Sequence, residues 1–86
     1  MGRIRILDVS ELEPCEPLER TLAAIETLSL GECLRVLHRR DPLPLYEILE
    51  KRGFAHQTLV EGETAFEIWI WQQGDDQARQ LIPPPQ

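Results

Sequence analysis

The chain has 86 residues, of which 42% are hydrophobic and 28% charged, a composition that suits one small globular domain with a modest core. Its formal net charge of −6 disfavours general binding to nucleic acid or to an anionic membrane. No stretch approaches the roughly 20 apolar residues of a transmembrane helix. The N-terminus also lacks the long apolar centre of a signal peptide, so we predict a cytoplasmic protein with no membrane partner.

The first half of the chain predicts a strand, a helix and a second strand. Residues 3–9, "RIRILDV", alternate apolar and basic side chains with the period of a half-buried strand. A helix is predicted to begin near Pro17, since proline suits the first helical turn. Gly31 ends this unit, and "CLRVLH", residues 33–38, predicts the second strand. The helix carries one apolar stripe formed by Leu18, Leu22, Ile25 and Leu28.

The second half predicts a helix and a β-hairpin. The helix runs from about Pro44 to Arg52, with Gly53 as a natural cap. Strands are predicted over residues 54–60 and 64–71, joined by a tight turn at 61–63. Residues 74–86 are polar and include three consecutive prolines, so we predict a flexible C-terminal tail after a domain that spans residues 1–73.

This order, βαβαββ, predicts an α+β fold: a two-layer sandwich with a four-stranded mixed sheet and two helices on one face. Strand alternation then divides the sheet residues into two sets. The set predicted to face the helices is Ile4, Ile6, Leu34, Val36, Phe66, Ile68 and Ile70. The set predicted to face away is Arg3, Arg5, Cys33, Arg35, Leu37, Glu67, Trp69 and Trp71.

The fold also predicts where the two cysteines lie. The first helix separates Cys15 from Cys33 by roughly 16 Å, too far for a disulfide, which needs Cα atoms within about 7 Å. Cys15 and His38 both fall at the carboxyl edge of the parallel strands, with Asp8 nearby, and sites in open α/β sheets often lie at this edge. We therefore take Cys15, His38 and Asp8 as one candidate site.

Three segments, "LDVSELEPCEPLE", "LSLGECLRVL" and "RRDPLPLYEILEKRGF", resemble the TusA/SirA-like superfamily, and most closely its branch of small bacterial proteins of unknown function. The resemblance covers roughly residues 6–71 and implies the same βαβαββ sandwich. In the TusA branch a Cys-Pro-x-Pro motif opens the first helix, and its cysteine carries persulfide sulfur between partner proteins. Here the order is Pro-Cys-Glu-Pro, so the carrier position falls on Pro14 and Cys15 falls on the motif's first proline.

Each residue of the candidate site has a functional and a structural interpretation. The helix N-terminus favours a Cys15 thiolate, whereas Glu13, Glu16 and Glu19 disfavour it. A small residue tolerated at the helix entry is the alternative. His38 could orient a thiol, bind an anion or ligate a metal, or could simply form a local hydrogen bond. No metal-ligand pair at short spacing and no glycine-rich phosphate loop occurs, so we predict neither a metal nor a cofactor.

A second candidate is the sheet face turned away from the helices. Trp69 and Trp71 lie two residues apart on one strand and so share a face, where Arg5, Arg35 and Leu37 are predicted to flank them. Tryptophan and arginine are enriched in the energetic centres of protein interfaces. The alternative is that the C-terminal tail, through Leu81 and Ile82, folds over the tryptophans.

Together these features predict a small adaptor or carrier-like protein that acts by docking to protein partners or by self-association through the open sheet face. A non-enzymatic role is favoured, because no oxyanion loop accompanies Cys15 and His38. One alternative is a persulfide carrier that uses Cys15. The other is an RNA-binding module that uses the Trp69/Trp71 face, although the net charge weighs against it.

Overall fold

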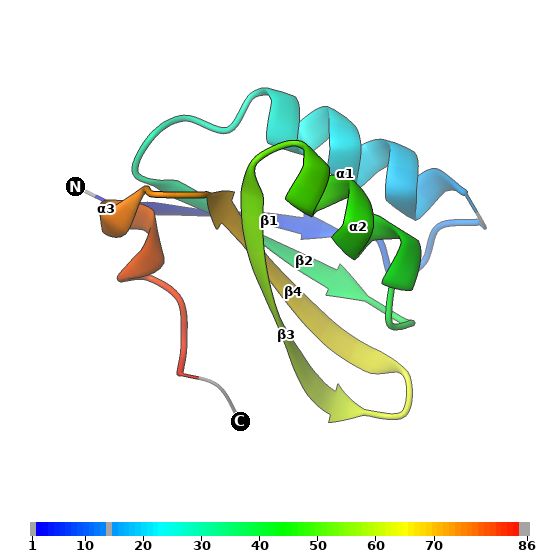
Figure 1. The fold of residues 1–86 in the computed structure, drawn as a ribbon. Helices are drawn as coiled ribbons and strands as arrows, with labels where there is room; N and C mark the ends of the chain where they lie inside the picture. Colours follow the sequence, from blue (N-terminus) through cyan, green and yellow to red (C-terminus); the bar gives the residue numbers. More distant parts are fainter. Residues whose placement is uncertain (1, 14, 85–86) are drawn as a thin grey trace.

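The computed structural model describes residues 2–13 and 15–84. The elements follow one another as β1 (Arg3–Asp8), α1 (Glu16–Glu26), β2 (Glu32–His38), α2 (Leu43–Lys51), β3 (Phe54–Gly62), β4 (Ala65–Gln72) and a short α3 (Asp76–Arg79). The strands form one mixed sheet in the order β1-β2-β4-β3, in which β1 is parallel to β2 and both β2 and β3 are antiparallel to β4. The predicted α+β fold is therefore confirmed (Figure 1).

Helices α1 and α2 cover the same face of the sheet (Figure 1). Ile25 of α1 and both Leu45 and Leu49 of α2 are buried against that face. The predicted stripe points inward, but α1 ends at Glu26, so Leu28 joins the core from the segment after the helix. Gly53 adopts φ 84°, a left-handed conformation that suits glycine where α2 ends. The core between the layers is completed by Val9, Leu28, Leu34, Val36, Ile68 and Ile70.

The faces of β2 and β4 are as predicted, but those of β1 are reversed. Leu7 lies opposite Val36 and packs against the core, whereas Ile4 and Ile6 are 43% and 62% exposed on the other face. The apolar residues of "RIRILDV" fit two alternations, Ile4–Ile6 and Leu7–Val9. The second is used because Leu7 and Val9 lie next to the helices, and Val9 is fully buried.

The reversal also moves Arg5. We predicted this residue on the open face, but its guanidinium donates to Thr27 Oγ1 (3.2 Å) at the end of α1 and lies 3.8 Å from Glu32. Arg5 is therefore on the helix face, where a polar side chain is satisfied at the edge of the core. It does not flank the tryptophans.

The segment after β4, expected as a flexible tail, contains α3 and packs against the sheet face opposite α1 and α2. Asp75 caps α3 by accepting from the Ala78 N–H (3.2 Å) and also accepts from the Gly31 N–H (2.7 Å). Gln57 on β3 donates to the Pro83 carbonyl. Ala78, Leu81 and Ile82 thus close a second, smaller core over Cys33, Leu59 and Trp69.

Within the described part of the chain, no helix is both long and apolar enough to span a lipid bilayer.

Candidate functional site

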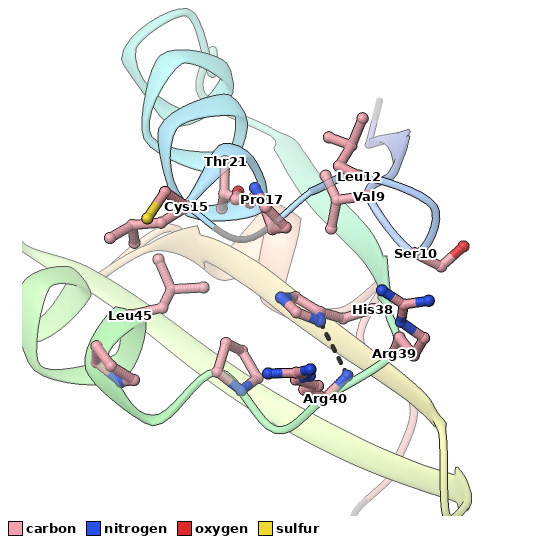
Figure 2. A pocket seen from close by; sticks show the side chains of 13 residues that line it. Val9, Ser10, Leu12, Cys15, Pro17, Thr21, His38, Arg39, Arg40 and Leu45 are labelled. Carbon is pink, nitrogen blue, oxygen red and sulfur yellow. Dashed lines mark hydrogen bonds between the residues drawn. The ribbon is translucent and has the colours of Figure 1, made fainter.

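A pocket of about 270 Å³ opens where β1 and β2 end and where α1 and α2 begin. Its wall comes from four segments: the loop after β1, the first turns of α1, the end of β2 with the loop that follows, and the start of α2 (Figure 2). Cys15 and His38 both line this pocket. The structure therefore brings together two of the three residues of the predicted edge site.

Cys15 is the N-terminal cap residue of α1 and is exposed to solvent. Its backbone has φ 78° and ψ −33°, and it is the one non-glycine residue among residues 2–13 and 15–84 with a positive φ. Such a conformation costs a residue with a Cβ on the order of 1–3 kcal/mol. The adjoining Pro14, onto which the carrier position of the resemblance falls, lies outside the described residues.

His38 is half-buried at the end of β2, and its Nδ1 accepts a hydrogen bond from the Arg40 backbone N–H (3.0 Å). This bond assigns the proton of the neutral imidazole to Nε2. Burial lowers the pKa of His38, the charges of Arg40 and Arg39 lower it further, and Asp41 opposes the shift. The neutral ring, with one N–H donor, is therefore favoured.

The thiol and the imidazole do not form a catalytic pair in this arrangement. Figure 2 shows the His38 ring in the middle of the pocket, whereas the Cys15 sulfur lies beside the start of α1 and does not point toward the ring. No hydrogen bond joins the two side chains in the part of the chain that is described here. Cys15 therefore has no oriented general base.

Asp8 does not line the pocket. Its carboxylate accepts from the backbone N–H of Ser10 (3.0 Å) and from the Ser10 hydroxyl (2.6 Å), and these bonds lower the pKa of Asp8. Its role is to shape the loop that follows β1, from which Ser10 reaches the pocket wall. Across the described ranges, no group of three or more His, Cys, Asp or Glu side chains is arranged to hold a metal ion.

Sequence reasoning missed most of the pocket wall. Val9, Thr21 and Leu45 are buried and form its inner part, and Thr21 donates to the Pro17 carbonyl (2.8 Å). Arg39 and Arg40 line its mouth. The signal that points to the arginines is the run "HRRDP", because it spans the end of a parallel strand and therefore lies at the same edge as the start of α1.

The second candidate region is the sheet face beneath α3. Trp69 is buried there at 7% exposure, and Trp71 is half-buried against the same cluster. Arg35 forms a charged hydrogen bond with Glu67, and its guanidinium carbon lies 5.7 Å from the centre of the Trp69 ring. Leu37, on the same face of β2, is half-buried opposite Glu67. The predicted aromatic surface is thus largely covered by the chain's own C-terminal segment.

The buried thiol in this region is Cys33, which is fully enclosed with Trp69 and Ala78. Burial raises the pKa of Cys33, so the protonated thiol is favoured there. Both cysteines are free, and they lie in the two different regions.

Comparisons with known proteins place the chain in one family. No curated protein and no solved structure matches it. A family model does match, and it spans residues 6–72, from β1 to the end of β4. The chain therefore belongs to the family described as "Uncharacterized conserved protein (DUF2249)".

Proposed function

We propose that this chain is a small, non-enzymatic carrier-like protein that docks to partner proteins and works through the pocket at Cys15 and His38. The observation that carries the proposal is an exposed cysteine, held at φ 78°, on the wall of a pocket that it shares with His38, Arg39 and Arg40. An accessible thiol without an oriented base suits the passive carriage of a small group better than turnover of a substrate.

The contact surface that we propose for docking lies beside the pocket. Leu43, the first residue of α2, is 66% exposed and lies between Pro42 and Pro44, which both line the pocket. A partner that covers the pocket mouth would bury this leucine. Burial of a leucine side chain is worth about 2 kcal/mol, so Leu43 is a natural anchor for such a partner.

We further propose that the group carried is sulfane sulfur on Cys15, as the resemblance to the TusA/SirA-like superfamily implies. In this step the Cys15 thiolate attacks the outer sulfur of a donor persulfide. A new S–S bond forms on Cys15, the S–S bond of the donor breaks, and the donor leaves as a thiolate that takes up a proton. Transfer to an acceptor thiol is the same exchange in reverse and needs no external oxidant.

The support for a Cys15 carrier is positional. Although Cys15 is shifted by one residue from the motif position, it is the cap residue of α1, and its thiol remains exposed. A helix N-terminus stabilises a thiolate. Glu16 and Glu19 in the first turn oppose this effect. We therefore expect a thiol that exchanges sulfur but is only modestly activated.

The test is intact-mass analysis after treatment with a persulfide donor. Wild type is expected to gain the mass of one sulfur atom, Cys33→Ser to gain the same, and Cys15→Ser to gain none. An unmodified wild type would remove the persulfide proposal, and a modified Cys15→Ser would assign the sulfur to Cys33. If Cys15 is not loaded, the docking proposal is still tested separately by whether Leu43→Glu abolishes retention of a co-purifying partner.

RNA binding through the tryptophans is the weaker alternative. Base stacking needs an exposed aromatic face, and Trp69 is 7% exposed beneath α3. The structure offers no observation that favours it over docking.

A further inference from the structure

We propose that the pocket binds a small organic anion, an acidic head group on a short apolar body, with Arg39, Arg40 and the Nε2–H of His38 as the anion contacts. This inference deepens the proposed function, because it names the ligand class of the same pocket. It does not depend on any chemistry at Cys15.

The pocket mouth carries two adjacent positive charges. Arg39 and Arg40 are exposed and line the pocket, and neither forms an ion pair with another described residue. In a chain of net charge −6, two adjacent arginines without an ion pair to the described residues concentrate positive charge at one place. Guanidinium groups bind carboxylates and phosphates through paired N–H donors.

Two acidic side chains near the arginines are already hydrogen-bonded, since Asp41 directly follows Arg40 and Asp8 ends β1 opposite Leu37. Asp41 accepts from the hydroxyl of Tyr46 (2.6 Å), and Asp8 accepts twice from Ser10. Neither carboxylate forms an ion pair with Arg39 or Arg40, so both guanidinium groups are available to an external anion.

His38 adds a donor that the fold holds in place. Its Nδ1 is occupied by the Arg40 backbone N–H, so Nε2 carries the proton of the neutral ring. Figure 2 shows the ring inside the pocket, with Arg40 on one side and Val9 and Pro17 on the other. No partner for Nε2 occurs among residues 2–13 and 15–84.

The inner part of the pocket indicates that the ligand has a short apolar body. Val9 and Leu45 are buried, and Leu12 and Leu18 complete an apolar wall. The volume of about 270 Å³ lies just below the usual range of ligand cavities, roughly 300–1,000 Å³. A short aliphatic chain fits this space, whereas a nucleotide or a large cofactor does not.

The experiment is an NMR titration of the 15N-labelled wild-type protein with matched probes. Hexanoate is expected to shift the amides of Ser10, Thr21 and His38, and to bind at least about tenfold more tightly than neutral hexanamide. Acetate is expected to bind at least about tenfold more weakly than hexanoate, because it lacks the apolar chain. Hexyl phosphate distinguishes a phosphate ligand from a carboxylate ligand: tighter binding than hexanoate assigns the head group as phosphate, and weaker binding assigns it as carboxylate.

The arginine contribution is tested by the double variant Arg39→Gln/Arg40→Gln. We expect hexanoate affinity to fall about three- to tenfold while hexanamide affinity is unchanged. Arg52→Gln is the matched control, because Arg52 is exposed at the end of α2 and outside the pocket, and it should bind as wild type does. A dispersed spectrum of each variant shows that it is folded.

Equal binding of hexanoate and hexanamide, unchanged hexanoate affinity in the double variant, or shifts confined to other regions would each overturn the inference. The result is separate from that of the persulfide test. Hexanoate binding without sulfur loading would support the anion site and contradict the persulfide proposal. Sulfur loading without hexanoate binding would support the persulfide proposal and contradict the anion site.

Discussion

The pocket and the face beneath α3 contain similar residue types but satisfy them in opposite ways. In the pocket, Arg39 and Arg40 form no ion pair with any residue that the structure describes, and Cys15 is exposed. Beneath α3, Arg35 is paired with Glu67 and Cys33 is fully buried. Arginine, cysteine and an aromatic or imidazole ring therefore do not mark a site by themselves. In the candidate site these groups are still able to bind a ligand, whereas beneath α3 they already contact other residues of the chain.

The largest predicted difference between the two regions is in the reactivity of their thiols. Cys15 is expected to react with iodoacetamide at least about a thousandfold faster than Cys33, because Cys33 reacts only after the C-terminal segment opens, at a cost of about 4 kcal/mol. The rates are measured by mass spectrometry in Cys33→Ser and Cys15→Ser, which isolate one thiol each. Comparable rates would show that the face beneath α3 is open in solution.

A second prediction concerns the energetic weight of the buried face. Trp69→Ala is expected to lower the free energy of unfolding by about 3–4 kcal/mol, since a large buried side chain is removed. Urea denaturation measures the change. The half-buried Trp71 provides the control, and Trp71→Ala should cost about half as much or less. A loss below about 1 kcal/mol for Trp69→Ala would place this ring outside the folded core.

A third prediction concerns the link that holds the C-terminal segment. Asp75→Ala removes the acceptor for both Ala78 and Gly31 and should cost about 1–2 kcal/mol. Tryptophan emission should shift to longer wavelength as the segment loosens. Asp76→Ala, at the exposed neighbouring position, should change neither quantity. A matching effect of both substitutions would contradict the role of the Asp75 contacts.

The smallest predicted effect is a pH dependence that originates at His38. Because the fold lowers the pKa of His38 below its ordinary 6.5, the unfolded chain binds this proton more readily than the folded one does. The contribution to stability is therefore complete above about pH 6.5 and is lost as the pH falls through the lower folded value. The ring is partly exposed, so the loss should stay below about 1 kcal/mol.

His38→Gln should flatten this part of the stability profile, measured by urea denaturation at several pH values. His56→Gln, outside the pocket, should keep the loss. An undiminished decline in His38→Gln would assign the effect to carboxylates instead.

The parts of the molecule that the sequence predicted correctly depend on periodicity. Each of these elements has one apolar period in its sequence, and only one orientation of the element buries those apolar side chains. This holds for the stripe of α1 and for the faces of β2 and β4. The β1 strand was predicted backwards because it offers two alternations, and only the position of the helices chooses between them. A polar segment rich in proline gave no periodic signal for α3. Its packing comes from long-range contacts, among them the hydrogen bond between Asp75 and Gly31 and the burial of Ala78 against Trp69.

The candidate site was predicted in part for the same reason. Topology was enough to bring Cys15 and His38 to one edge. It could not show that the sulfur points away from the imidazole, that Asp8 is bound to Ser10, or that Arg5 lies on the helix face. These are properties of side-chain direction, which depend on the exact start of a helix and on the phase of a strand.

The backbone at Cys15 has a consequence for how the gene can change. At φ 78° a glycine would relieve the strain, and Cys15→Gly should stabilise the fold by about 1 kcal/mol. A cysteine codon becomes a glycine codon by a single nucleotide change, so the relaxing mutation is always within one step. A lineage that keeps a thiol at this position therefore keeps a less stable fold than the glycine variant would have. Retention of Cys15 among close relatives would indicate that the thiol has a function.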